Sequence, residues 1–136
     1  MSVMAKSFSQ CISTANNQAR LEREDALVEC FKLHKAFIGS DNCFKQIHYL
    51  KAAQKSENLS EKLKSICFYE ASIFQNSKLC SARASEFKDA DTHDEAIFDC
   101  FMQFQDKINQ KNCIELSSKL IYPAKKDYLL AHCQNI

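Results

Sequence analysis

Residues 67–80 of the 136-residue chain read CFYEASIFQNSKLC. This stretch opens on Cys-Phe and reaches its second cysteine after twelve intervening residues, and the same outline recurs at residues 30–43 and 100–113. The three copies start 37 and 33 residues apart. A period of about 20–50 residues is typical of stacked supersecondary units, so the spacing predicts an internal helical repeat.

The repeat covers most of the chain. Units are expected near residues 26–58, 63–91 and 96–123, with half-units at both ends that contain Cys11 and Cys133. An apolar residue follows each second cysteine by seven positions, and these residues are Leu50, Phe87 and Leu120. The length suits one domain that buries about two thirds of its unfolded surface, so we predict a single cysteine-rich domain over residues 1–136.

The composition indicates an all-α fold. One glycine and one proline remove most of the turn chemistry that β-sheet proteins need, whereas helices need neither residue. We predict seven or eight helices arranged as disulfide-stapled hairpins, in either a short repeat array or a compact bundle. The helices are expected at residues 3–15, 19–38, 41–55, 60–74, 79–90, 92–108, 113–121 and 123–133.

Three signals mark the expected boundaries. Gly39 suits the left-handed residue that follows a last helical turn. Thr92 and Glu95 have the spacing of a capping box, which places a helix start at Thr92. Pro123 suits a first helical turn, because its missing amide would be unpaired there.

Eight cysteines, an even number, favour an oxidising compartment. We therefore expect a secreted or periplasmic protein. Residues 1–6 lack the apolar run of a signal peptide, which suggests that a leader has been removed. Asn58 begins a glycosylation sequon, usable only in a eukaryotic source. Nothing in the sequence approaches the length of about 20 apolar residues that a membrane span needs.

Two regular pairings of the cysteines compete. The short-spaced set joins residues 30 to 43, 67 to 80 and 100 to 113. In that set, Cys11 would have to form a disulfide with Cys133. The long-spaced set, which we favour, is Cys11 with Cys30, Cys43 with Cys67, Cys80 with Cys100, and Cys113 with Cys133. Bonded residues of a hairpin should lie about equally far from its turn, since their Cα atoms must approach within about 7 Å. Cys113 and Cys133 satisfy this around Pro123, whereas Cys67 and Cys80 would be offset by about 9 Å along their helices.

No motif indicates a metal, a cofactor or an enzyme. Cysteine ligands of zinc come in close pairs, and no two cysteines here are closer than thirteen positions. His34 and His48 fall on helix stripes, where core histidines are common. The densest acidic set, residues 89–95, occupies the approach to a helix, where carboxylates offset the helix dipole. Glu70 lies on an inner stripe and is the carboxylate for which we expect a raised pKa.

A net charge of +1 disfavours nucleic acid as a partner. The charge is uneven, however, with a local excess of +4 over residues 32–64 and of −6 over residues 86–106. We predict a non-enzymatic helical module that binds another macromolecule, a protein or another kind. Four lysines are the candidate contacts for that partner: Lys32, Lys35, Lys45 and Lys51.

The alternative function is a carrier of a small apolar ligand, such as a lipid or an odorant. The chain has ten phenylalanines, and an aromatic helical interior can leave a cavity of that kind. Ordinary core packing explains the same residues. The candidate cavity residues are Phe31, Phe68, Phe74, Phe101 and Phe104.

Overall fold

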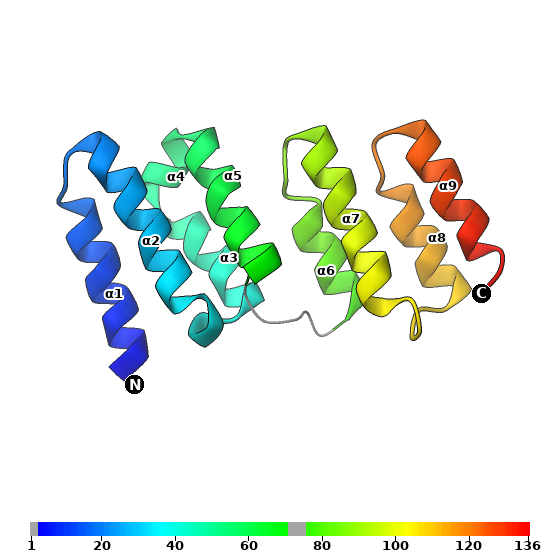
Figure 1. The fold of residues 1–136 in the computed structure, drawn as a ribbon, viewed down its shortest axis with the longest axis horizontal. Coiled ribbons are helices and arrows are strands. Elements are labelled where there is room, and N and C mark those ends of the chain that lie inside the picture. The colour runs from blue at the N-terminus through cyan, green and yellow to red at the C-terminus, as the bar shows by residue number, and fades with distance from the viewer. Residues whose placement is uncertain (1–2, 71–75) are drawn as a thin grey trace. The chain divides into compact units, whose positions relative to one another are not determined.

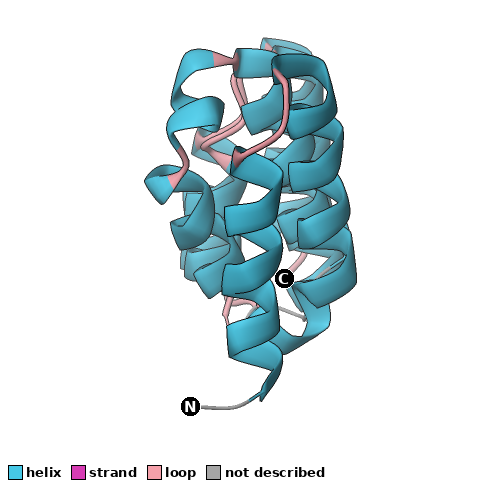
Figure 2. Cartoon of the chain, turned by 90° about the vertical axis from the view of Figure 1, so that its left-hand side faces the viewer, coloured by secondary structure: helices cyan, strands magenta, loops and turns pink. Residues whose placement is uncertain are grey.

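The protein is described by a computed structural model that covers residues 3–70 and 76–136, without the side chains of residues 3–7, 36, 37, 40, 41 and 70. Within these ranges the chain forms nine α-helices and one π-helical turn, with no strand (Figures 1 and 2). The predicted all-α, disulfide-stapled class is confirmed. The helix count exceeds the expected seven or eight because one predicted helix is broken.

The chain divides into two compact units, Met1–Ile73 and Phe74–Ile136. Unit 1 begins with the hairpin of α1 (Val3–Asn16) and α2 (Arg20–Ile38). It continues through α3 (Ser40–Tyr49), α4 (Lys51–Lys55) and α5 (Glu57–Ser65), which runs directly into the π-helical turn Ile66–Glu70.

Gly39 ends α2 and precedes α3 at φ 76° and ψ 160°. This backbone region is essentially restricted to glycine, because a Cβ atom would clash there. The amide of Gly39 still donates to the carbonyl of Lys35, so the last turn of α2 closes normally. The predicted break after residue 38 is confirmed, although Gly39 adopts an extended positive-φ conformation and not the left-handed helical one.

The expected helix 41–55 breaks at Leu50, which has extended backbone angles (φ −84°, ψ 116°). The Leu50 side chain is buried, as are Cys43 and Ile47 on the same side of α3. The side-chain amide of Gln54 donates to the carbonyl of His48 at 2.8 Å and thereby satisfies an acceptor near the break.

Unit 2 consists of two hairpins. The first pairs α6 (Ser77–Ala84) with α7 (Ala90–Phe104), and the second pairs α8 (Gln110–Ser118) with α9 (Pro123–Cys133). Asparagine caps open the first helix of each hairpin, since Asn76 accepts from the amide of Leu79 and Asn109 accepts from that of Asn112, both at 2.8 Å. Such caps typically contribute about 1 kcal/mol each.

Several predicted helix starts and ends are wrong by two to six residues. The helix expected from residue 92 begins at Ala90 with Asp89 as its cap, because the Asp89 carboxylate accepts both the amide and the hydroxyl of Thr92. The capping box at Thr92 is therefore displaced by three residues. α5 begins at Glu57, capped by Ser56, three residues before the expected start at residue 60, and α6 ends at Ala84, six residues short of residue 90.

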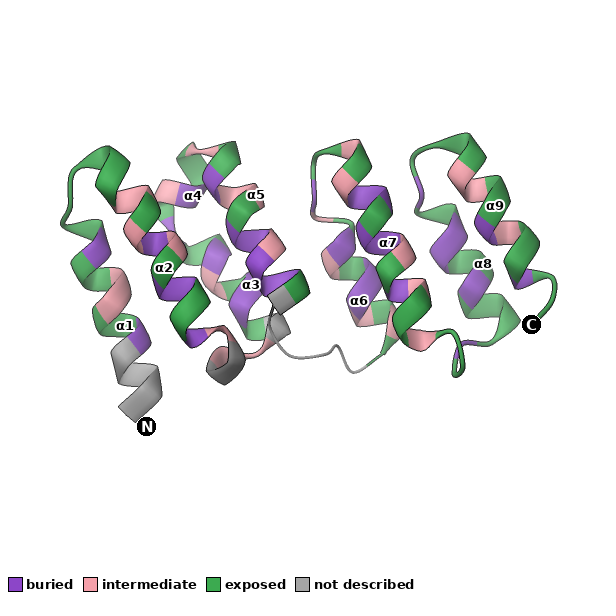
Figure 3. Ribbon diagram, in the orientation of Figure 1, coloured by how far each residue is buried: buried purple, intermediate pink, exposed green. Residues whose placement is uncertain are grey.

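Each hairpin contains one disulfide that joins its two sides. The bonds are Cys11–Cys30, Cys43–Cys67, Cys80–Cys100 and Cys113–Cys133, with Cα–Cα distances of 5.5–5.7 Å. These are the four long-spaced pairs favoured from the sequence. Seven of the eight cysteines are buried, with Cys11 half-buried, so the cystines are part of the core in both units (Figure 3).

Aliphatic and aromatic side chains complete the two cores. The apolar residues seven positions after the second cysteines, Leu50, Phe87 and Leu120, are all buried. In unit 1, Phe31 is fully buried and packs edge-on against Phe8, with ring centroids 5.4 Å apart. The largest other fully buried side chains are Leu27, Phe44, Leu59, Leu63, Ile97 and Leu129.

Replacement of the glycine at the α2–α3 junction tests the junction. We expect Gly39→Ala to destabilise unit 1 by about 1–3 kcal/mol, because alanine cannot adopt the observed angles without strain. Urea unfolding followed by circular dichroism gives the value, with Ala52→Gly in the short helix α4 as a comparison for ordinary helix propensity. A variant as stable as the natural chain would contradict the observed junction.

Removal of one cross-link tests the pairing. We expect the double variant Cys80→Ser/Cys100→Ser to lose about 3 kcal/mol of stability, because a bridge across some 20 residues restricts the unfolded chain. The single variants should lose at least as much, and each should leave one reactive thiol. Peptide mapping of the unreduced natural chain should recover the four long-spaced pairs, and recovery of residues 67 and 80 in one bridged peptide would refute the connectivity.

Candidate functional site

An open groove of about 470 Å³ lies in unit 1, where the α1–α2 turn approaches the junction of α3 and α4. Its lining consists of Asn16, Arg23, Tyr49, Leu50, Lys51, Ala52 and Lys55. Three of these seven side chains are cationic and none is acidic. Within the described part of the chain, no carboxylate lies within ion-pair distance of Lys51 or Lys55. We call this feature the basic groove.

Arg23 is held in place by the preceding turn. Its Nε and Nη2 atoms donate to the carbonyl of Gln18 at 3.3 and 3.2 Å. Arg23 precedes the fully buried Leu27 by one helical turn, so the inner stripe of α2 directs it toward the groove. Two donors of the guanidinium fix its position and the remaining N–H groups stay available, an arrangement that suits recognition of an anion.

The other charged and aromatic lining residues lie on either side of the break at Leu50, with Tyr49 before it and Lys51 and Lys55 after it. Tyr49 is the last residue of α3 and is 76% exposed, although tyrosine side chains usually bury their rings. Lys51 and Lys55 lie one turn apart on α4. The ring of Tyr49 and the ammonium groups of Lys51 and Lys55 therefore line the same groove as Arg23.

The structure places the four predicted lysines on three helices, and their role as partner contacts stays a prediction. Only Lys51 lines the basic groove, while Lys32 and Lys35 lie on α2 and Lys45 lies on α3. Sequence reasoning missed Arg23, Tyr49 and Lys55. The signal for Arg23 was its position one turn before Leu27, whereas the breaking of the predicted helix at Leu50 had no clear signal.

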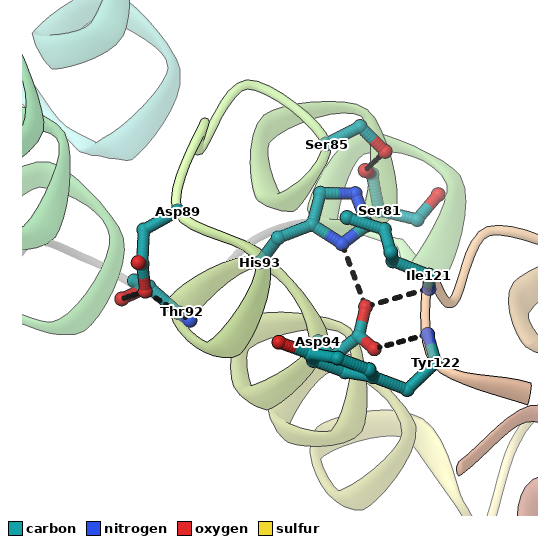
Figure 4. Close-up of polar contacts among 8 residues, drawn as sticks. All are labelled: Ser81, Ser85, Asp89, Thr92, His93, Asp94, Ile121 and Tyr122. Atoms are coloured by element: carbon teal, nitrogen blue, oxygen red, sulfur yellow. Dashed lines mark hydrogen bonds and ion pairs between the residues drawn. The ribbon is translucent and has the colours of Figure 1, made fainter. Parts of the chain in front are cut away.

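The acidic set of residues 89–95 has structural roles in unit 2. Asp94 is fully buried, and its carboxylate accepts from the amides of Ile121 at 2.8 Å and Tyr122 at 2.9 Å (Figure 4). His93 Nδ1 donates to the same carboxylate at 2.9 Å. Asp94 thus ties α7 to the turn between α8 and α9, and we call this set of contacts the Asp94 clamp.

The clamp lowers the pKa of Asp94. Burial acts to raise the pKa of this carboxyl, but the hydrogen bonds from the amides of Tyr122 and Ile121, together with His93, outweigh burial and bring the pKa below its ordinary value of 3.8. The backbone and hydroxyl hydrogen bonds from Thr92 likewise lower the pKa of Asp89.

A serine near His93 and Asp94 invites comparison with a catalytic relay (Figure 4). Ser81 donates to the carbonyl of Lys78, however, and Ser85 donates to the carbonyl of Ser81. Each hydroxyl is therefore bonded to the backbone, and the Asp94 carboxylate is occupied by two amides. The contacts support a structural role for these residues.

Unit 2 contains a second groove, of about 460 Å³, between α6 and α8. Its lining is mixed in charge, with Lys78, Lys119 and Glu115 around a floor that includes Leu116 and Ser81. It lacks the uniform charge of the basic groove, so it ranks second as a candidate site.

The five phenylalanines of the carrier hypothesis are distributed over both units. Phe31 and Phe68 are buried in unit 1, whereas Phe101 and Phe104 are half-buried on α7 of unit 2, and Phe74 lies outside the described residues. No phenylalanine lines either of the two grooves. The carrier remains a prediction.

The remaining residues singled out from the sequence are His34, His48 and Glu70. His34 is buried against the ring of Phe8, while His48 is exposed on α3. The side chain of Glu70 lies outside the described residues. Among the side chains that are described, no three His, Cys, Asp or Glu residues are placed to hold a metal ion, and no described helix has the length and apolarity to cross a bilayer.

Comparisons with protein-family models, with curated proteins and with solved structures give no significant match to this chain.

The Asp94 clamp predicts a specific acid sensitivity. Because the pKa of Asp94 is lower in the folded protein than in the unfolded chain, its contribution to stability is complete above pH 3.8 and is lost as the pH falls through the folded-state pKa. We expect Asp94→Asn to cost about 1–3 kcal/mol at neutral pH, since its amide would face backbone donors, and to weaken the loss of stability on acidification.

Urea unfolding between neutral pH and about pH 2 measures both effects. Hydrogen exchange should place the loss in α7 and in the α8–α9 turn. The matched control is Glu95→Gln, which neutralises the exposed neighbouring carboxylate. An unchanged acid dependence in Asp94→Asn would contradict the clamp.

Proposed function

We propose that this protein is a non-enzymatic helical module, secreted or periplasmic, that binds an acidic face of a partner protein through the basic groove of unit 1. The observation that carries the proposal is the convergence of Arg23, Lys51 and Lys55 on one groove without an acidic lining residue. Lys51 and Lys55 have no carboxylate within ion-pair distance among the described residues, so they can bind carboxylates of another protein without breaking an ion pair seen here.

The exposed ring in the groove favours a protein partner. Tyrosine and arginine are enriched among residues that dominate protein interfaces, because each combines a large contact area with directed hydrogen bonds. Tyr49 can supply apolar contact where the three cations supply charge. Exposed ion pairs are worth only about 0.2–1 kcal/mol each, so we expect moderate affinity that decreases with salt.

The cysteines support the proposed compartment. All eight form disulfides in this structure, and proteins of the reducing cytosol rarely keep such bonds. Four disulfides fit an extracellular or periplasmic setting. The choice between these two settings is part of the proposal.

Charge reversal tests the groove. We expect Lys51→Glu/Lys55→Glu to bind a fluorescein-labelled glutamate-rich peptide about tenfold or more weakly than the natural chain, because two attractive charges become repulsive. Fluorescence anisotropy at low and high salt gives the affinities. The matched control is Lys107→Glu/Lys111→Glu, which reverses two exposed lysines of unit 2.

Equal weakening by both double variants would indicate a response to net charge alone and would refute the site. Failure of the natural chain to bind the peptide would refute the acidic-protein partner, and binding of heparin in its place would assign the groove to a sulfated polysaccharide. Tyr49→Ser separates the contribution of the ring and should weaken binding without changing its salt dependence.

A further inference from the structure

A row of aromatic side chains lies between α7 and α9 of unit 2, which run side by side in Figure 1. The ring of Phe98 is 6.0 Å from that of Tyr128, and the ring of His132 is 4.6 Å from Tyr128 and 6.3 Å from Phe101. Together with Met102, one turn beyond Phe98, these residues form what we call the aromatic furrow.

The furrow is unusually open for its composition. Tyr128 is 60% exposed and Met102 is 59% exposed, while both phenylalanines are half-buried. Contiguous apolar surface on a protein commonly marks an interaction site. Methionine and aromatic side chains are enriched at protein interfaces, where they pack closely against the surface of a partner.

The rim of the furrow is acidic at one end. Helical spacing places Asp91, Glu95, Phe98 and Met102 along one stripe of α7, since they are separated by four, three and four residues. The first half of the stripe is therefore anionic and the second half apolar. Asp91 and Glu95 are both exposed, and like charges one turn apart weaken an isolated helix.

Tyr122 lies beside Asp91 at this end of the stripe. The ammonium of Lys125 already lies 4.9 Å from the centroid of the Tyr122 ring, a cation–π contact. Hydrogen bonding to Asp91, followed by the charges of Asp91, Asp89 and Asp94, raises the pKa of the Tyr122 hydroxyl, as expected where the local potential is negative.

We propose that the aromatic furrow is a second docking surface, and that its occupant is a basic amphipathic helix of a partner protein. The apolar face of such a helix would cover Phe98, Met102 and Tyr128, and its cations would meet Asp91 and Glu95. The side chains of a bound helix can fit between those that two neighbouring helices expose. The stripe from Asp91 to Met102 is about 16 Å long, the length of about three turns of a bound helix.

The absence of tryptophan from the chain makes the test direct. The probe is a synthetic helical peptide with leucines on one face, lysines at its flanks and one tryptophan among the leucines, whose fluorescence reports on the peptide alone. It is titrated with the full chain, all disulfides intact. We expect a blue shift on binding, and none for a version with glutamate in place of lysine or for one of scrambled order.

Substitutions in the aromatic furrow test whether the peptide binds there. We expect Tyr128→Ser and Met102→Ser each to weaken binding about tenfold, and Glu95→Gln to weaken it about threefold. The matched control is Ile114→Ser, which removes an exposed apolar side chain of α8 in the same unit and should leave the affinity unchanged. Circular dichroism verifies that each variant is folded.

Several outcomes would overturn the proposal: no binding of the lysine peptide, equal binding of the scrambled peptide, or equal affinities for Tyr128→Ser and Ile114→Ser. Concentration-dependent self-association that Tyr128→Ser abolishes, without peptide binding, would assign the furrow to a second copy of the chain. The basic groove is tested separately, because Lys51→Glu/Lys55→Glu should leave binding of this peptide intact.

Discussion

The cross-link inside each helical hairpin is the constraint on which the rest of the structure depends. α6 and α8 contain only eight and nine residues, lengths at which a helix alone is marginal in water. A bridge across about 20 residues removes much of the freedom of the unfolded hairpin, and the buried cystine replaces side chains that a larger core would need. Helices held in this way can leave rings exposed, such as Tyr49 on α3 and Tyr128 on α9.

The contacts between hairpins differ in the two units. In unit 1, α2 packs against α5 and the π-helical turn, through buried side chains such as Leu27 and Leu63. In unit 2, a buried carboxylate adds a polar connection, because Asp94 accepts from the turn that precedes α9. A carboxylate there is stable only while its hydrogen bonds offset the cost of burial, which couples the packing of unit 2 to pH.

The sequence predicted those features that depend on spacing and failed where tertiary contacts compete with local preference. The cysteine spacing indicated the long-spaced bridges, and Gly39 and Pro123 marked helix boundaries. Leu50 gave no such signal, because in a continuous helix it would also lie on the inner stripe with Cys43 and Ile47. Thr92 and Glu95 have the spacing of a capping box, yet the carboxylate of Asp89 caps the helix three residues earlier. Local charge density along the sequence cannot show which faces of separate helices converge on one groove.

The near-zero net charge of the chain conceals two surfaces of opposite character. Beyond a Debye length of about 8–10 Å, their fields largely cancel or are screened, so long-range steering of a charged partner is weak. Recognition then depends on short-range contacts, in which a fixed guanidinium or an exposed ring contributes more than the total charge. In each unit the site combines charge with an aromatic side chain: Arg23 with Tyr49 in the basic groove, and Glu95 with Tyr128 at the furrow. If both proposed surfaces bind as we propose, one small chain would contact two partners of different chemistry, and the disulfides would keep each surface in shape.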